Sequence, residues 1–151
     1  MTTAALAPPA QPPEQNASYR FTAPRLPSTP ALARHWVADL LRFGGRAHLA
    51  ERAELCTSEV ATNAYLHTAS PLMTVEVSLS TEGVTVCVHD GAPGRKPQVR
   101  PTWADPSSLS PTGRGLGLVS AYADMWSAVS DESSKTVWFM LSDSSTARCA
   151  A

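Results

Sequence analysis

The apolar residues of this chain change their spacing just after His67, and that change limits the folds open to it. Before this point they recur every three or four residues, as on one face of a helix. After it they alternate with polar residues, in two short runs joined by the turn-like sequence Ser80–Gly83. Helices and a hairpin that each have one apolar face must cover one another. We therefore expect an α+β fold in two layers.

Two long helices are predicted in the first half of the chain. The first begins near Ser28, where a hydroxyl precedes a proline, and ends at Gly44-Gly45. Its apolar face comprises Leu32, Trp36, Val37, Leu40 and Leu41. The second helix is expected over Ala47–His67, with an apolar stripe of Leu49, Ala53, Cys56, Val60 and Ala64.

The remaining elements are four or five strands and a third helix. Strands are expected at residues 19–23, 75–79, 84–90, 125–130 and 135–141. The proline-rich segment 95–112 is predicted to be a long loop, and a helix should follow it to about Ala123. Because hairpins join the strands, the sheet should be mixed or mostly antiparallel, with helices on one face.

The composition is that of one ordinary globular domain. The chain has 151 residues and a formal net charge of −1, which does not indicate broad attraction to nucleic acid or an anionic membrane, and no local basic stripe is evident. Its three cysteines fit no zinc pattern, and no signal peptide or membrane-spanning run is evident, so a cytoplasmic protein is expected. Residues 1–17 and 144–151 are expected to be disordered tails around a domain of residues 18–143.

Three polar residues of the second predicted helix lie at or within its apolar stripe. Glu59, Asn63 and His67 are four residues apart and therefore stack along one side. Burying such groups without partners costs roughly 1–3 kcal/mol each, so they either bond internally or line a polar cavity. An acid and an amide suit Mg²⁺ and phosphate chemistry, whereas His67 is better interpreted as a hydrogen-bonded core histidine.

Asp90 and two groups of glycines are the other candidates. Asp90 ends a predicted strand and precedes Gly91 and Gly94, so it is either a plain turn residue or an acceptor for a ligand amine. The run Gly113-Arg114-Gly115-Leu116-Gly117 opens a helix, where free backbone N–H groups bind phosphate and Arg114 would add a charged donor. The alternative is a flexible hinge with a solvated arginine. The run is neither a dinucleotide fingerprint nor a Walker loop.

In this order along the chain, these residues resemble the GHKL ATPase superfamily of sensor histidine kinases, gyrase-type ATPases, chaperone ATPases and anti-sigma factor kinases. Glu59 and Asn63 match its N box, and Gly113–Gly117 matches its second glycine box. Asp90–Gly94 is similar to its first glycine box, although it reads Asp-Gly-Ala-Pro-Gly where the family pattern is Asp-x-Gly-x-Gly. The resemblance implies a Bergerat-type two-layer α/β sandwich that binds ATP and Mg²⁺.

The resemblance also implies roles for these residues. Glu59 would orient or deprotonate the attacking hydroxyl, Asn63 would coordinate Mg²⁺, and Asp90 would recognise the adenine amine. Thr136 falls where the family has a threonine near the adenine. The other nucleotide contacts would come from Gly94, Gly113, Arg114, Gly115, Leu116 and Gly117.

Within the superfamily, the chain is most similar to the anti-sigma factor kinases and small ATP-binding regulators of actinobacteria. That similarity implies a serine/threonine kinase which holds a sigma factor inactive, or instead phosphorylates a STAS-domain anti-anti-sigma protein. It would contact neither nucleic acid nor membrane directly, and the formation of a homodimer is left open. Two alternatives remain: an ATP-gated binding module that transfers no phosphate, and an interaction domain with a degenerate pocket.

Overall fold

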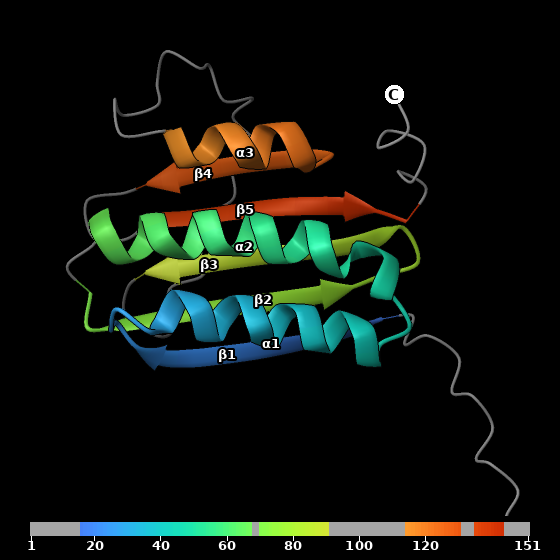
Figure 1. Ribbon diagram of the computed structural model, residues 1–151, viewed down its shortest axis with the longest axis horizontal. Helices are drawn as coiled ribbons and strands as arrows, with labels where there is room; N and C mark the ends of the chain where they lie inside the picture. Colours follow the sequence, from blue (N-terminus) through green and yellow to red (C-terminus); the bar gives the residue numbers. More distant parts are fainter. Residues whose placement is uncertain (1–15, 68–69, 91–113, 131–134, 144–151) are drawn as a thin grey trace, which may run out of the picture.

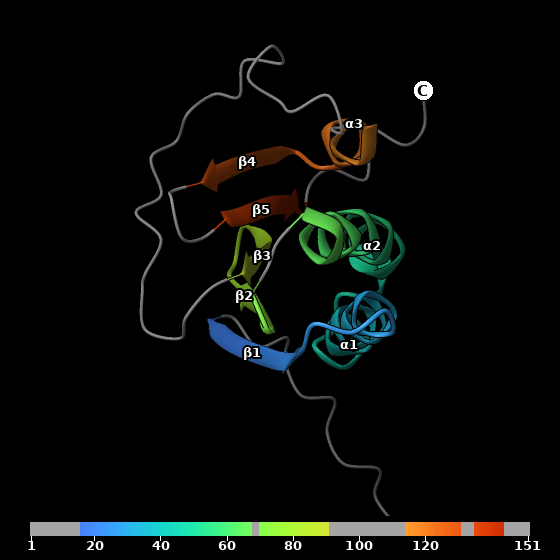
Figure 2. The same ribbon diagram turned by 90° about the vertical axis from the view of Figure 1, so that its left-hand side faces the viewer.

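The computed structural model describes residues 16–67, 70–90, 114–130 and 135–143 (Figure 1). The elements along the chain are β1 (Ala17–Pro24), α1 (Thr29–Phe43), α2 (Ala47–His67), β2 (Leu72–Leu79), β3 (Gly83–Asp90), α3 (Arg114–Tyr122), β4 (Met125–Ser130) and β5 (Lys135–Ser142). The strands form one sheet, and α1, α2 and α3 lie together on one face of it (Figures 1 and 2). The predicted two-layer α+β fold is confirmed.

The sheet has the strand order β1-β2-β3-β5-β4. Every pairing among the described strands is antiparallel, so the parallel component of a mixed sheet is not seen among them. Strand β1 begins earlier than expected, because Ala17, the last residue of the predicted disordered tail, already pairs with Leu79 of β2. The predicted loop 95–112 and the C-terminal tail 144–151 lie outside the described residues.

The core fills the space between the sheet and the helices. Alternate residues of β2, β3 and β5 point toward the helix layer, where they are almost fully buried: Val75, Val77, Val84, Val86, Val88, Val137, Phe139 and Leu141. Each such side chain contributes about 1.5–3 kcal/mol on burial. From the helices, Val37 and Leu41 of α1 and Leu49 and Val60 of α2 meet them. Leu32, expected on the apolar face of α1, is instead exposed.

A buried arginine joins the start of α2 to the β2–β3 hairpin. Arg46 donates from Nη1 to the carbonyl oxygen of Gly83 at 2.8 Å and from Nη2 to the carbonyl oxygen of Ser80. The Asp143 carboxylate lies 3.2 Å from Nη1 and balances its charge. Gly83 is required here, because a Cβ would lie 2.1 Å from the Leu141 carbonyl oxygen. These contacts hold the end of the sheet that is remote from Asp90.

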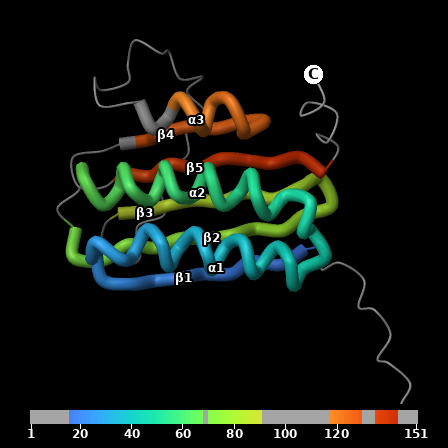
Figure 3. Tube along the Cα trace, in the orientation of Figure 1, coloured from blue at the N-terminus to red at the C-terminus, as the bar shows by residue number. Residues whose placement is uncertain are grey.

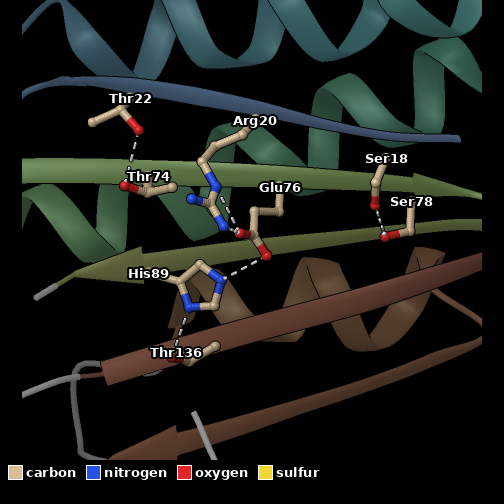
Figure 4. A network of polar contacts seen from close by, with 8 residues as sticks. All are labelled: Ser18, Arg20, Thr22, Thr74, Glu76, Ser78, His89 and Thr136. Carbon is tan, nitrogen blue, oxygen red and sulfur yellow. Dashed lines mark hydrogen bonds and ion pairs between the residues drawn. The ribbon is translucent and has the colours of Figure 1, made fainter. Parts of the chain in front are cut away.

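The other sheet face, here called the open face because no described helix covers it, carries a chain of polar contacts (Figure 4). Arg20 donates from Nε to Glu76 at 2.8 Å, and Glu76 lies 3.3 Å from Nε2 of His89. Nδ1 of His89 is 3.1 Å from the Thr136 hydroxyl. Burial raises the pKa of Glu76, but hydrogen bonds from Arg20 and His89 outweigh it and leave that pKa lowered. Four strands are thereby linked across the open face.

Candidate functional site

Helix α3 packs beside α2 and runs in the opposite direction. Near the start of α2, Arg52 donates from Nε and Nη2 to the carbonyl oxygen of Tyr122, the last residue of α3, at 3.2 and 2.6 Å. The start of α3 therefore lies beside the C-terminal half of α2. The trace in Figure 3 shows that β3 also ends, and β5 begins, at this end of the molecule. The ends of α2 and β3 and the starts of α3 and β5 thus lie at the same end of the molecule.

Glu59 and Asn63 lie on the side of α2 that faces α3. A helix turns about 100° per residue, so these residues are offset by about 20° to either side of Arg52, whose contact with Tyr122 marks that side. Both are partly buried. Within the described part of the chain, neither side chain has a hydrogen-bond partner. The structure therefore does not show the internal network that was the alternative to a polar cavity.

His67 does not join this pair. It was expected to be a hydrogen-bonded core histidine, but it is exposed. It is the last residue of α2 and lies beyond Val60 and Ala61, the last buried residues of that helix. That expectation was wrong.

Asp90 is buried at the end of β3, with 7% of its surface exposed. It shares its sheet face with Val86 and Val88, which pack in the core, so its side chain lies on the helix side. One carboxylate oxygen accepts a hydrogen bond from the backbone N–H of Lys135 on β5. The carboxylate is therefore anchored at the same end of the molecule as Asn63 and the start of α3.

Thr136 does not share this environment. It lies directly across from His89 and contacts it on the open face, opposite the face that carries Asp90 (Figure 4). The strand register instead sets Lys135 across from Asp90. Lys135 was not predicted as a site residue. It alternates with the apolar Val137 and Phe139, however, and this pattern indicates that it lies on the face of the sheet that the helices cover.

The glycine-rich run is described only in part. Gly94 and Gly113 lie outside the described residues, and the backbone of Arg114, Gly115 and Leu116 forms the first turn of α3. The first four N–H groups of a helix have no partner inside it, so this turn can offer donors to an anion. Gly117 is exposed, and a Cβ at this position would meet no atom of another described segment within 4 Å.

Comparison with known families decides the wider assignment. The model of the histidine kinase-like ATPase domain matches residues 23–141. This chain belongs to the histidine kinase-like ATPase family. The matched segment contains α2, Asp90 and α3, so the family assignment covers the whole candidate site. Membership of this family implies that the domain binds ATP and is of the ATP-using kinase and ATPase type. A search of curated proteins found no match.

The side-chain oxygens at the candidate site of this histidine kinase-like ATPase domain suit a nucleotide that is bound together with Mg²⁺. Among the described residues, no cluster of three or more His, Cys, Asp or Glu side chains could hold a metal. Magnesium commonly binds through one or two protein oxygens together with substrate phosphates and water. The Asn63 amide oxygen, with Glu59 one turn away, fits that arrangement.

A separate groove of about 600 Å³ crosses the outer side of α2. It is lined by Arg34, Glu51, Arg52, Glu54, Leu55, Ser58 and Tyr122. Glu59, Asn63 and Asp90 do not line it, so it is distinct from the candidate ATP site. In the described part of the chain, the helices are too short or too polar to cross a membrane.

Gly117→Ala should separate the stability of the domain from its nucleotide affinity. An alanine inside a helix is favoured over glycine by about 1 kcal/mol, and the space around Gly117 is open, so thermal stability should rise slightly. ATP affinity should fall, since the new methyl group would occupy space where phosphate approaches α3. Thermal unfolding and titration calorimetry measure the two effects. A stabilised variant that binds ATP as the wild type does would show that phosphate does not approach Gly117.

Proposed function

We propose that this histidine kinase-like ATPase domain is an ATP- and Mg²⁺-dependent serine/threonine protein kinase that acts as an anti-sigma factor. The chain would act in a partner-switching cycle, in which it binds one of two proteins in turn. In one state it holds a sigma factor inactive. Alternatively, it binds a STAS-domain anti-anti-sigma protein and phosphorylates it on a serine or threonine. Support comes from the runs Ser58–Ala64 and Thr112–Val119, whose sequences are similar to the corresponding runs in the small ATP-binding regulators of actinobacteria.

The observation that carries the proposal is the placement of Glu59 and Asn63. They face α3 one turn apart, are partly buried, and have no hydrogen-bond partner in the described part of the chain. An acid left unpaired beside the start of a helix that attracts phosphate is well placed to act on a hydroxyl next to that phosphate. A purely structural role would leave this pair without an explanation.

The chemistry follows from these positions. Glu59 would orient the acceptor hydroxyl and take its proton as the oxygen bonds to the terminal phosphorus of ATP, while the bond from that phosphorus to the bridging oxygen breaks and ADP leaves. The N–H groups that open α3, together with Arg114, would stabilise the charge on the phosphoryl oxygens. Asp90 would accept the adenine amine. Asn63 would hold Mg²⁺, which supplies charge neutralisation at the phosphates.

Asn63→Ala should weaken nucleotide binding in a Mg²⁺-dependent way. Loss of a direct ligand should cost at least about tenfold in affinity for ATP with Mg²⁺, the effect that even outer-shell changes produce at metal sites. Affinity for ADP in the presence of a chelator should change little. The control is Thr62→Ala, an exposed neighbour on α2. Equal losses with and without Mg²⁺ would exclude Asn63 as the metal ligand.

The second candidate function is an ATP-gated binding module that transfers no phosphate. It is favoured by the departure of Asp90-Gly91-Ala92-Pro93-Gly94 from the family pattern. Incubation with terminally labelled ATP and the STAS-domain proteins of the source organism separates the two functions. Label on a serine or threonine supports the kinase, whereas an ATP-dependent complex without label supports the gated module.

A further inference from the structure

We propose that Lys135 is a nucleotide-binding residue that reads the adenine base together with Asp90. This inference depends on the proposed ATP site and extends it to the side chains that select the base. It starts from the register of β3 and β5, in which Asp90 and Lys135 lie directly across from each other. Their connection is direct, because the Lys135 N–H donates to the Asp90 carboxylate.

The side chains of both residues project from the helix side of the sheet. Residues directly opposite each other in an antiparallel pair share a face, with Cβ atoms roughly 4.5–5.5 Å apart. Val88 and Val137, the next pair along, share that register and are core residues. Lys135, the first residue of β5, is only partly buried, so its long side chain is accessible at the end of the sheet where β5 begins.

The Lys135 ammonium is not used by a neighbouring acid. Within the described residues, no ion pair joins it to Asp90 or to any other carboxylate. Two opposite charges therefore lie on neighbouring strands without neutralising each other directly. This leaves one acceptor group and one donor group side by side for a ligand.

Adenine presents the complementary pair. Its amine is a donor, and the adjacent ring atom N1 is an acceptor. A carboxylate only accepts and an ammonium only donates, so Asp90 suits the amine and Lys135 suits N1. Thr136 cannot take this role from the open face, where its hydroxyl contacts His89.

The test compares Lys135→Met, which removes the donor but keeps the length of the side chain, with Thr136→Val. Titration calorimetry is carried out with ATP and with 1-deaza-ATP, in which C–H replaces N1. A hydrogen bond to a charged group is worth about 1.5–3 kcal/mol, so Lys135→Met should weaken ATP binding roughly 10- to 150-fold. The same substitution should not weaken 1-deaza-ATP further, and Thr136→Val should bind ATP as the wild type does.

Three results would overturn the inference: unchanged ATP affinity in Lys135→Met, an equal loss for both nucleotides, or a loss confined to Thr136→Val. Lys135→Leu, which also lacks a donor, provides a second variant should the methionine variant fail to fold, and circular dichroism checks each protein. Wild-type protein that binds no ATP would refute the proposed function itself. Wild type that binds ATP and is weakened by Asp90→Asn but not by Lys135→Met would refute only the role of Lys135.

Discussion

Replacing Glu59 with glutamine should nearly abolish phosphate transfer while ATP binding stays close to that of the wild type. Glutamine keeps the size and polarity of the side chain but cannot take a proton from the acceptor hydroxyl. A positioned general base contributes about 10²- to 10⁴-fold to a rate, and the loss should fall in that range. Glu59 is only partly buried, so a side chain of the same size should fit there without repacking.

Single-turnover transfer from labelled ATP measures this loss, and calorimetry on the same samples measures binding. The matched control is Glu51→Gln, an exposed acid on the same helix, which should transfer phosphate at the wild-type rate. Transfer by Glu59→Gln at that rate would remove Glu59 from the mechanism.

Asp90→Asn should lower ATP affinity by roughly 10- to 150-fold, the value of a hydrogen bond to a charged group. The asparagine carbonyl oxygen can still accept the Lys135 N–H, so the junction of β3 and β5 should survive. The other carboxylate oxygen becomes an NH₂ group, which would face the adenine amine donor to donor. The variant should therefore fold normally and bind poorly.

Calorimetry and thermal unfolding test both parts of this prediction. Asp39→Asn changes an exposed acid of α1 in the same way and should affect neither. Wild-type ATP affinity in Asp90→Asn would show that the carboxylate does not read the base. Loss of folding would assign Asp90 a structural role.

The elements predicted best are those whose signals are local. Helix α2 runs over Ala47–His67 as its apolar spacing and flanking residues predicted, and the β2–β3 hairpin forms around the expected turn. Spacing on the helix singled out Glu59 and Asn63 together with His67, and the resemblance to the N box then selected the first two. Local periodicity therefore predicted that Glu59 and Asn63 lie on the same side of α2.

The features that were missed depend on contacts between distant parts of the chain. Strand β5 pairs with β3 rather than only with β4, and the register of that pairing sets Lys135 directly across from Asp90. The resemblance pointed to Thr136, whereas the alternation of side chains within β5 already placed it on the opposite face. Arg46 gave no local signal either, because its partners are carbonyl groups of a turn formed far along the chain.

The central claim is that the end of the molecule shared by Asn63, Asp90 and the start of α3 binds ATP with Mg²⁺. Titration calorimetry of the wild-type protein with ATP and Mg²⁺ tests it most directly. We expect saturable binding at one site per chain with micromolar affinity, accompanied by a rise in unfolding temperature as ligand is added. The absence of both heat and stabilisation at millimolar ATP, whatever the Mg²⁺ concentration, would contradict the claim and leave a protein-interaction domain that keeps the fold.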